Sequence, residues 1–487
     1  MRSLTSIGGL VAAALLCFPG AWAQRPPKDS QSSGPVTPIQ PLSPLTGGSD
    51  GSNQAIADNV SLTQSGAAPG ASAQAQPDTH VLSSAETLGV GSLRGLRHMF
   101  DPALQFSEFY ETGLVAGRAT VVSNLGGSLD LDEHWGPYHL AASYNGTEAF
   151  YQPSYSGMHF VPYQGLSVSP EILLRRWTLR LRDSALYSWG AGLGGLFTGG
   201  PAQAAENSSL NTIQPSLLPN GPIQTGPARE LNNIVLAEAD YASSRRTTLT
   251  FLASDGLVHF LAPGYIDSQS LHGRVGYNYA VSAANSISLS YDYNRTSFGG
   301  ASNRLQTDQV QMGFGRKITG RLALQLEAGP QLLRLADFGS SGSRQPSWTA
   351  FGAVTYNLPR SGYYLSYTHG VTPGSGVFFG SKNDTVTGMA TREFTQFWSA
   401  SVNGGYAINK NLVPAGNFVS RFDTWFAGAN LNRQLGRQVR LSLSYGFQRQ
   451  SSGGGVCPVL SCGLPGSISF RQFGATLQWH PLTVRSR

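Results

Sequence analysis

The sequence predicts an all-β fold: a transmembrane antiparallel up-and-down β-barrel with a disordered N-terminal tail. Three observations lead to this fold class: period-two alternation in segment after segment, an export signal with no long apolar helix behind it, and connections that alternate between short and long. Alternation places apolar side chains on one face of a strand and polar side chains on the other. A barrel in lipid explains the pattern, because its outer face meets hydrocarbon and its inner face meets water.

The alternation is clearest in three segments. Residues 286–294 place isoleucine, leucine and tyrosine at odd positions and serine, aspartate and asparagine at even ones. Residues 321–328 place leucines at even positions, with arginine, glutamine and glutamate among the odd ones. Residues 439–448 place valine, leucine, tyrosine and phenylalanine at odd positions, opposed by arginine, serine and glutamine. Charged residues on the polar face of several strands indicate a water-filled interior.

The N-terminal residues have the features of a secretory signal. Arg2 supplies the positive charge, residues 10–18 are apolar, and Ala21-Trp22-Ala23 is an A-x-A cleavage site, so residues 1–23 are predicted to be a signal peptide. Residues 24–105 are rich in Pro, Ser, Gln, Gly and Ala, a composition that buries too little apolar area to fold, and they are predicted to be a disordered periplasmic tail. A tether to the cell wall or to a partner and a plain spacer both remain open for this tail. The barrel is predicted over residues 106–487.

The alternating pattern predicts eighteen strands. They are expected near residues 112–122, 126–133, 138–146, 159–170, 175–188, 231–242, 245–256, 268–282, 285–297, 304–317, 320–333, 346–357, 362–370, 385–394, 397–407, 418–431, 438–448 and 467–480. Parity along the chain allows sixteen strands beginning at 138–146, or eighteen if the first two ranges pair as a hairpin. We favour eighteen.

The connections between these strands differ in length in a regular way. Short links at 242–245, 282–285, 317–320, 357–362 and 434–437 alternate with longer links rich in Gly, Ser, Pro and Asn. Short turns in the periplasm and long loops outside are typical of outer-membrane barrels. The longest link, 189–230, is expected either to fold inward and narrow the lumen or to lie in solvent.

The final predicted strand carries one further signal. Phe473, Ala475, Leu477 and Trp479 share a face, and polar residues occupy the other. This segment resembles the aromatic-ended closing strand of Gram-negative outer-membrane β-barrel, porin-like proteins, although residues 481–487 extend beyond the usual aromatic end. The resemblance implies a location in the cell outer membrane. It also implies contact with outer-membrane lipid and recognition by the barrel assembly machinery.

Charged residues on the polar faces are the candidate pore-lining residues. An antiparallel hairpin closed across residues 189–230 is expected to bring Arg180 close to Glu238. The full set comprises Arg176, Arg180, Arg182, Glu238, Asp240, Arg246, Arg274, Asp292, Arg321 and Glu327. Two interpretations fit them: a charge ladder that orients solutes, or a network of ion pairs that stiffens the barrel. The arginines of residues 176–182 predict a mild preference for anions.

Other kinds of site find little support. Cys457 and Cys462 form a close pair in a predicted loop of an exported chain and are expected to make a disulfide. The nine histidines show no metal-binding spacing, no nucleophile elbow is present, and no cofactor is expected. His369 and Asp384 flank one predicted loop and could belong to a barrel hydrolase. A formal charge of +6 without a cluster of Lys and Arg gives no indication of nucleic-acid binding.

These observations favour a non-enzymatic channel for passive passage of small solutes or an exported polymer. Two alternatives are an outer-membrane hydrolase and a structural or adhesive barrel with a blocked lumen. Single-channel conductance and loss of activity on mutation of rim residues would distinguish them.

Overall fold

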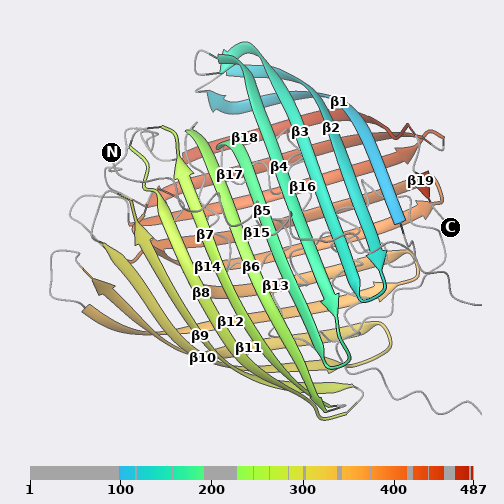
Figure 1. The fold of residues 1–487 in the computed structure, drawn as a ribbon. Helices are drawn as coiled ribbons and strands as arrows, with labels where there is room; N and C mark the ends of the chain where they lie inside the picture. Colours follow the sequence, from blue (N-terminus) through green and yellow to red (C-terminus); the bar gives the residue numbers. More distant parts are fainter. Residues whose placement is uncertain are drawn as a thin grey trace, which may run out of the picture. The chain divides into compact units, whose positions relative to one another are not determined.

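The computed structural model contains one closed, all-antiparallel β-barrel in its described residues (Figure 1). The described range is 98–485, with gaps at 116–117, 156–157, 191–227, 245, 263, 283, 300–302, 337–342, 373–375, 377, 414–419, 437, 454–466 and 482–483. The predicted signal peptide, nearly all of the predicted tail, and Cys457 and Cys462 lie outside it. No helix in the described part of the chain has the length and hydropathy needed to cross a membrane.

Eighteen strands form the wall, each paired with its neighbour in sequence. They are β1 (His98–Val115), β2 (Arg118–Trp135), β3 (Tyr138–Tyr155), β4 (Met158–Leu173), β5 (Trp177–Gly190), β6 (Ala228–Ser244), β7 (Thr247–Phe260), β8 (Ser268–Ala280), β9 (Asn285–Phe298), β10 (Arg304–Lys317), β11 (Leu322–Ala336), β12 (Ser343–Leu358), β13 (Ser361–Thr372), β14 (Ser381–Thr395), β15 (Trp398–Asn411), β16 (Arg421–Gln434), β17 (Val439–Gly453) and β18 (Ser467–Trp479). The predicted fold class and the preferred strand number are confirmed.

The barrel closes between its first and last strands. β1 and β18 pair in antiparallel register from Leu104 opposite Trp479 to Thr112 opposite Arg471. The residues after the aromatic end add a short strand, β19 (Val484–Arg485), which pairs with Met99 and Phe100 at the start of β1. Closure satisfies the backbone groups that an open sheet would leave unpaired at its edges.

The predicted first hairpin is misplaced. β1 begins at His98, inside the stretch predicted as tail, so the predicted boundary between residues 105 and 106 falls within a strand. The predicted strand 112–122 spans the end of β1, the connection at 116–117 and the start of β2. Alternation is interrupted in β1, where Glu108 is exposed and Phe109 is buried. Phe100, Leu104 and Phe106 are exposed on the outer face before this interruption, which hid the start of the strand from the sequence pattern.

The two faces of the wall differ in the way that the alternation predicts. In β9, even positions from Ser286 to Asp292 are buried, whereas Ile287, Leu289 and Tyr291 are exposed. In β17, Arg440 and Ser444 are buried while Leu443 and Tyr445 are exposed. The buried face points to the interior of the barrel, so in these two segments polar side chains lie inside and large apolar side chains lie outside.

The two ends of the barrel differ in the length of their connections. From β6 onward, the connections at one end contain at most four residues, and those at the other end contain at least five. We call the end with the short connections the short-turn end and the other the long-loop end. β1 begins and β18 ends at the short-turn end.

Candidate functional site: charged clusters on the inner wall

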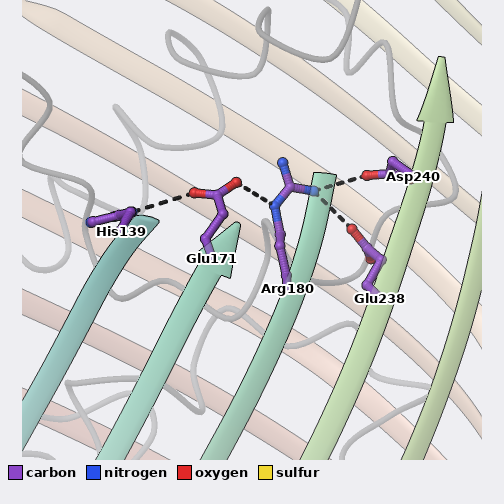
Figure 2. A network of polar contacts seen from close by, with 5 residues as sticks. All are labelled: His139, Glu171, Arg180, Glu238 and Asp240. Atoms are coloured by element: carbon purple, nitrogen blue, oxygen red, sulfur yellow. Dashed lines mark hydrogen bonds and ion pairs between the residues drawn. The ribbon is translucent and has the colours of Figure 1, made fainter. Parts of the chain in front are cut away.

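The first cluster links four neighbouring strands near the short-turn end. Arg180 of β5 donates from Nε to Glu171 Oε1 of β4 at 2.9 Å. Its Nη1 donates to Glu238 Oε1 at 2.8 Å and to Asp240 Oδ2 at 3.0 Å, both on β6. Glu171 Oε2 lies 3.3 Å from His139 Nδ1 on β3 (Figure 2). One guanidinium thus holds three carboxylates on the inner face.

Strand register explains why these residues meet. Glu171 lies directly opposite Arg180 between β4 and β5, and Arg180 lies directly opposite Glu238 between β5 and β6. Directly opposed residues in an antiparallel pair have Cβ atoms about 5 Å apart, within reach of an arginine and a glutamate. The contact between Arg180 and Glu238 that the sequence predicted is therefore confirmed.

A second cluster lies on the inner faces of β8 to β11. Asp292 Oδ1 accepts a hydrogen bond from Arg274 Nε and lies 3.0 Å from His272 Nε2. In the amide orientation that its neighbours favour, Gln311 donates to Glu327 at 2.6 Å and to Asp292 at 3.2 Å. Charge-assisted hydrogen bonds of this kind are stronger than neutral ones, and they fix the orientations of these side chains.

Leu252 of β7 lies between the two clusters. It is opposite Glu238 on one side and opposite Arg274 on the other, and its side chain is buried on the inner face. On β7, Thr250 instead carries the polar contact, donating to Asp240 Oδ1 at 2.7 Å. The two charged clusters are thus neighbours on the wall, with one apolar side chain between them in register.

The predicted pore-lining residues fall into two groups. Six of them lie buried on the inner face: Arg180, Glu238, Asp240, Arg274, Asp292 and Glu327. Arg182 is on the same strand as Arg180 and is half-buried. Arg176, Arg246 and Arg321 lie exposed in turns at the short-turn end. The arginine ladder of residues 176–182 therefore contributes fewer inner-wall charges than its alternation predicted.

The inner wall carries more acid than base. Its buried carboxylates are those of Glu111, Asp132, Glu230, Glu238, Asp240, Asp292 and Glu327, whereas its buried guanidinium groups are those of Arg180, Arg274 and Arg440. Seven carboxylates against three guanidinium groups, counted over the described residues that are buried, reverse the charge balance expected from the arginines alone.

A segment between β13 and β14 contacts the inner wall at the long-loop end. Phe379 meets Phe298 of β9 edge to face, with ring centroids 5.4 Å apart. Phe378, almost fully buried, meets Phe422 of β16 with centroids 5.3 Å apart. The carbonyl of Gly376 accepts a hydrogen bond from Ile266 N, in the β7–β8 connection, at 2.9 Å. Residues 376 and 378–380 thus contact the inner wall, through Phe379 at β9 and Phe378 at β16.

Two glycines permit this close approach. Gly376 has a φ of 72° and Gly380 a φ of 89°, values that side chains disfavour. A Cβ at Gly376 would lie 2.3 Å from the ring of Phe260, and a Cβ at Gly380 would lie 2.9 Å from Leu305. The sequence left open whether residues 189–230 fold inward or lie in solvent, and residues 191–227 of that link lie outside the described range. The sequence feature that could have identified the segment between β13 and β14 is the pair Phe378 and Phe379 with glycines on either side.

His369 and Asp384 do meet, but on the outer face. His369 Nδ1 lies 2.6 Å from Asp384 Oδ1, its ring stacks on the exposed Trp348 at 3.9 Å, and Asp384 also accepts from Tyr367 at 2.9 Å.

The same arrangement occurs twice more. Tyr291 donates to Asp308, and Tyr406 to Asp423, each across 17 residues of sequence as for Tyr367 and Asp384. Each aspartate also pairs with a basic side chain: Asp308 with Arg334, and Asp423 with Arg421. A motif repeated around the outer rim is typical of an interfacial aromatic girdle rather than of a catalytic dyad.

The fold and these clusters together define a large closed β-barrel with a charged inner wall. No known protein family matches the chain, and no curated protein matches it significantly. Solved structures with a similar fold include Pseudomonas aeruginosa OccK2 (OpdF) in complex with glucuronate, at 10% identity and a TM-score of 0.43, covering 79% of this chain and 98% of that one. Acinetobacter baumannii OccAB4 has 10% identity and a TM-score of 0.43, covering 80% and 99%. Pseudomonas aeruginosa OpdK with vanillate has 11% identity and a TM-score of 0.40, covering 80% and 99%.

Proposed function

We propose that this protein is an outer-membrane channel through which small polar solutes diffuse passively. The observation that carries the proposal is the division between the two faces of the wall. Large apolar side chains such as Leu289, Leu443 and Phe473 are exposed outside, while charged side chains are held inside. So much exposed apolar surface is unsuited to water but suited to hydrocarbon, where a closed barrel satisfies its own backbone.

The two ends of the barrel support an orientation. Bacterial outer-membrane barrels have short turns in the periplasm and longer loops outside. The short-turn end, which holds the start of β1 and the end of β18, would therefore face the periplasm. Residues 376–380 would then lie at the extracellular mouth, where a solute enters.

The charged clusters would bias which solutes pass. Barrels of about 18 strands leave an aqueous channel unless a loop or plug fills it. Because buried carboxylates outnumber buried guanidinium groups on the described wall, we expect a negative local potential that favours small cations over anions. This expectation is opposite to the mild anion preference that the arginines of residues 176–182 suggested from the sequence.

Reconstitution in planar bilayers tests this function. We expect discrete single-channel conductance and a reversal potential, under a salt gradient, that favours cations. The preference should weaken at high salt, because the Debye length falls to about 3 Å at 1 M. A folded, inserted protein that never conducts would contradict the proposal.

A barrel with a blocked lumen is a second candidate, favoured by the aromatic contacts at the long-loop mouth. Phe378 and Phe379 fasten residues 376–380 to strands on both sides. A wild-type protein without conductance and a variant with conductance after removal of both rings would support that candidate over an open channel.

A further inference from the structure

Two histidines and an aspartate converge beside the β2–β3 turn, at the edge of the first charged cluster. Asp132 and His134 lie on one face of β2, and His139 of β3 is directly opposite His134. Asp132 Oδ1 lies 3.1 Å from His134 Nδ1 and 3.1 Å from His139 Nε2. One oxygen and two imidazole nitrogens lie within 4.8 Å of one another.

These separations fit the coordination shell of a small divalent ion. Zn²⁺ binds nitrogen and oxygen ligands at about 2.1 Å, so ligand atoms of a tetrahedral site lie about 3.4 Å from one another. The two nitrogen–oxygen separations of 3.1 Å are close to that value. Imidazole and carboxylate are also ligand types that Zn²⁺ accepts.

A second carboxylate orients His139 in the way that metal ligands are usually oriented. Glu171 Oε2 lies 3.3 Å from His139 Nδ1, and Arg180 holds the other oxygen of Glu171 (Figure 2). A proton on Nδ1, donated to Glu171, leaves the lone pair of Nε2 directed toward Asp132. Two acceptors 3.1 Å apart repel unless a cation, either a proton or a metal ion, lies between them.

Metal binding requires the rings of His134 and His139 to leave their stacked arrangement. The rings stack with centroids 3.9 Å apart and an interplanar angle of 16°. The lone pairs of stacked rings lie in nearly parallel planes and do not meet at one ion, so one ring must rotate for both to bind. His134, whose side chain is 34% exposed at the end of the hairpin, is the ring that would rotate.

We propose that Asp132, His134 and His139 bind one divalent transition-metal ion of the Zn²⁺ type, with a fourth position open to water. Glu171 is a positioning residue for His139 rather than a ligand. The ion would stabilise the β2–β3 hairpin and link it to the first charged cluster, because His139 also contacts Glu171. This site does not depend on the proposed channel function.

The proposal is tested by measuring the affinity of the folded barrel, produced without an affinity tag, for Zn²⁺. Competition against a chromophoric chelator should give one tight site per chain. Substituting either histidine, as H134Q or H139Q, should weaken binding at least tenfold. E171Q should weaken it by a factor of about 10 to 100 while leaving all three ligands in place.

His259 provides the matched control. It lies 2.7 Å from Asp267 in a single His–carboxylate pair at the long-loop end. H259Q should bind Zn²⁺ as the wild type does. Equal affinity of the wild type and the H134Q/H139Q double variant would overturn the proposal, as would binding of less than one ion per chain.

Heat-modifiable migration on gels would reveal any variant that fails to fold. A measurement on the wild-type protein tests the site independently of such variants. X-ray absorption at the zinc edge should show two imidazole ligands with oxygen completing the shell. A shell with one imidazole or none would overturn the assignment, whatever the variants do.

Discussion

Arg180 and Glu238 face each other across the β5–β6 pair inside the barrel, with 2.8 Å between Nη1 and Oε1. Both side chains are buried, and the same guanidinium group also binds Asp240 and Glu171. Removing one partner of a buried ion pair leaves the other charge buried and unpaired. The free-energy cost of that unpaired charge exceeds the net stabilisation that the pair provides. Arg180 is therefore the most sensitive position of the first cluster.

Replacing Arg180 with Gln should shift the reversal potential further toward cations and destabilise the barrel. Three carboxylates would lose their shared cation, and loss of a buried partner costs about 3–5 kcal/mol. Planar-bilayer recordings and denaturant unfolding measure the two effects.

The double variant R180Q/E238Q is the control for this charge effect. Removing Glu238 as well restores the local charge balance, so stability and selectivity should both recover in part. If the double variant is as perturbed as the sum of the single variants, the two residues do not interact and the cluster has been misassigned.

The sequence predicts the wall well because alternation and burial have the same cause. A side chain on a two-faced strand is either inside or outside, so Ser288 and Leu289 could be assigned from their positions alone. Cross-strand partners such as Arg180 and Glu238 followed because a hairpin fixes its register.

The features that the sequence missed depend on contacts between distant segments or on interrupted patterns. β1 was misplaced because Glu108 and Phe109 reverse the expected faces. Arg176 was placed on a strand because alternation does not mark where a turn ends. His134 and His139 were overlooked because the predicted strand ended at residue 133, so their positions opposite each other were not apparent.

Arginine should be tolerated very differently at two adjacent positions of β17. Leu443 is exposed on the outer face, whereas Ser442 faces inward and donates to Asn432 at 2.7 Å. Arginine on the lipid face costs about 2–4 kcal/mol near the bilayer midplane. Unfolding of both variants in liposomes should show that loss for L443R and a clearly smaller one for S442R. Similar losses at both positions would contradict the assignment of the two faces.

Removing the hydroxyl of Tyr367 should have a small effect confined to stability. The hydroxyl donates to Asp384 on the outer rim, and a hydrogen bond of this kind contributes about 0.5–1.5 kcal/mol. Y367F should lower the unfolding free energy by that amount without changing conductance. Loss of a lipase or esterase activity in Y367F or H369N would instead favour the hydrolase alternative.

Removing the two rings of the β13–β14 segment should widen the long-loop mouth. Phe378 and Phe379 fasten this segment to Phe422 and Phe298, and the nearly complete burial of Phe378 makes its ring costly to lose. The F378A/F379A variant should therefore conduct more than the wild type, with larger fluctuations in current. The matched control is F473A on the outer face, where the ring is 56% exposed and points away from the lumen. That control should leave conductance unchanged. If both variants conduct like the wild type, residues 376–380 do not restrict the path, and the narrowest point lies at the charged clusters instead.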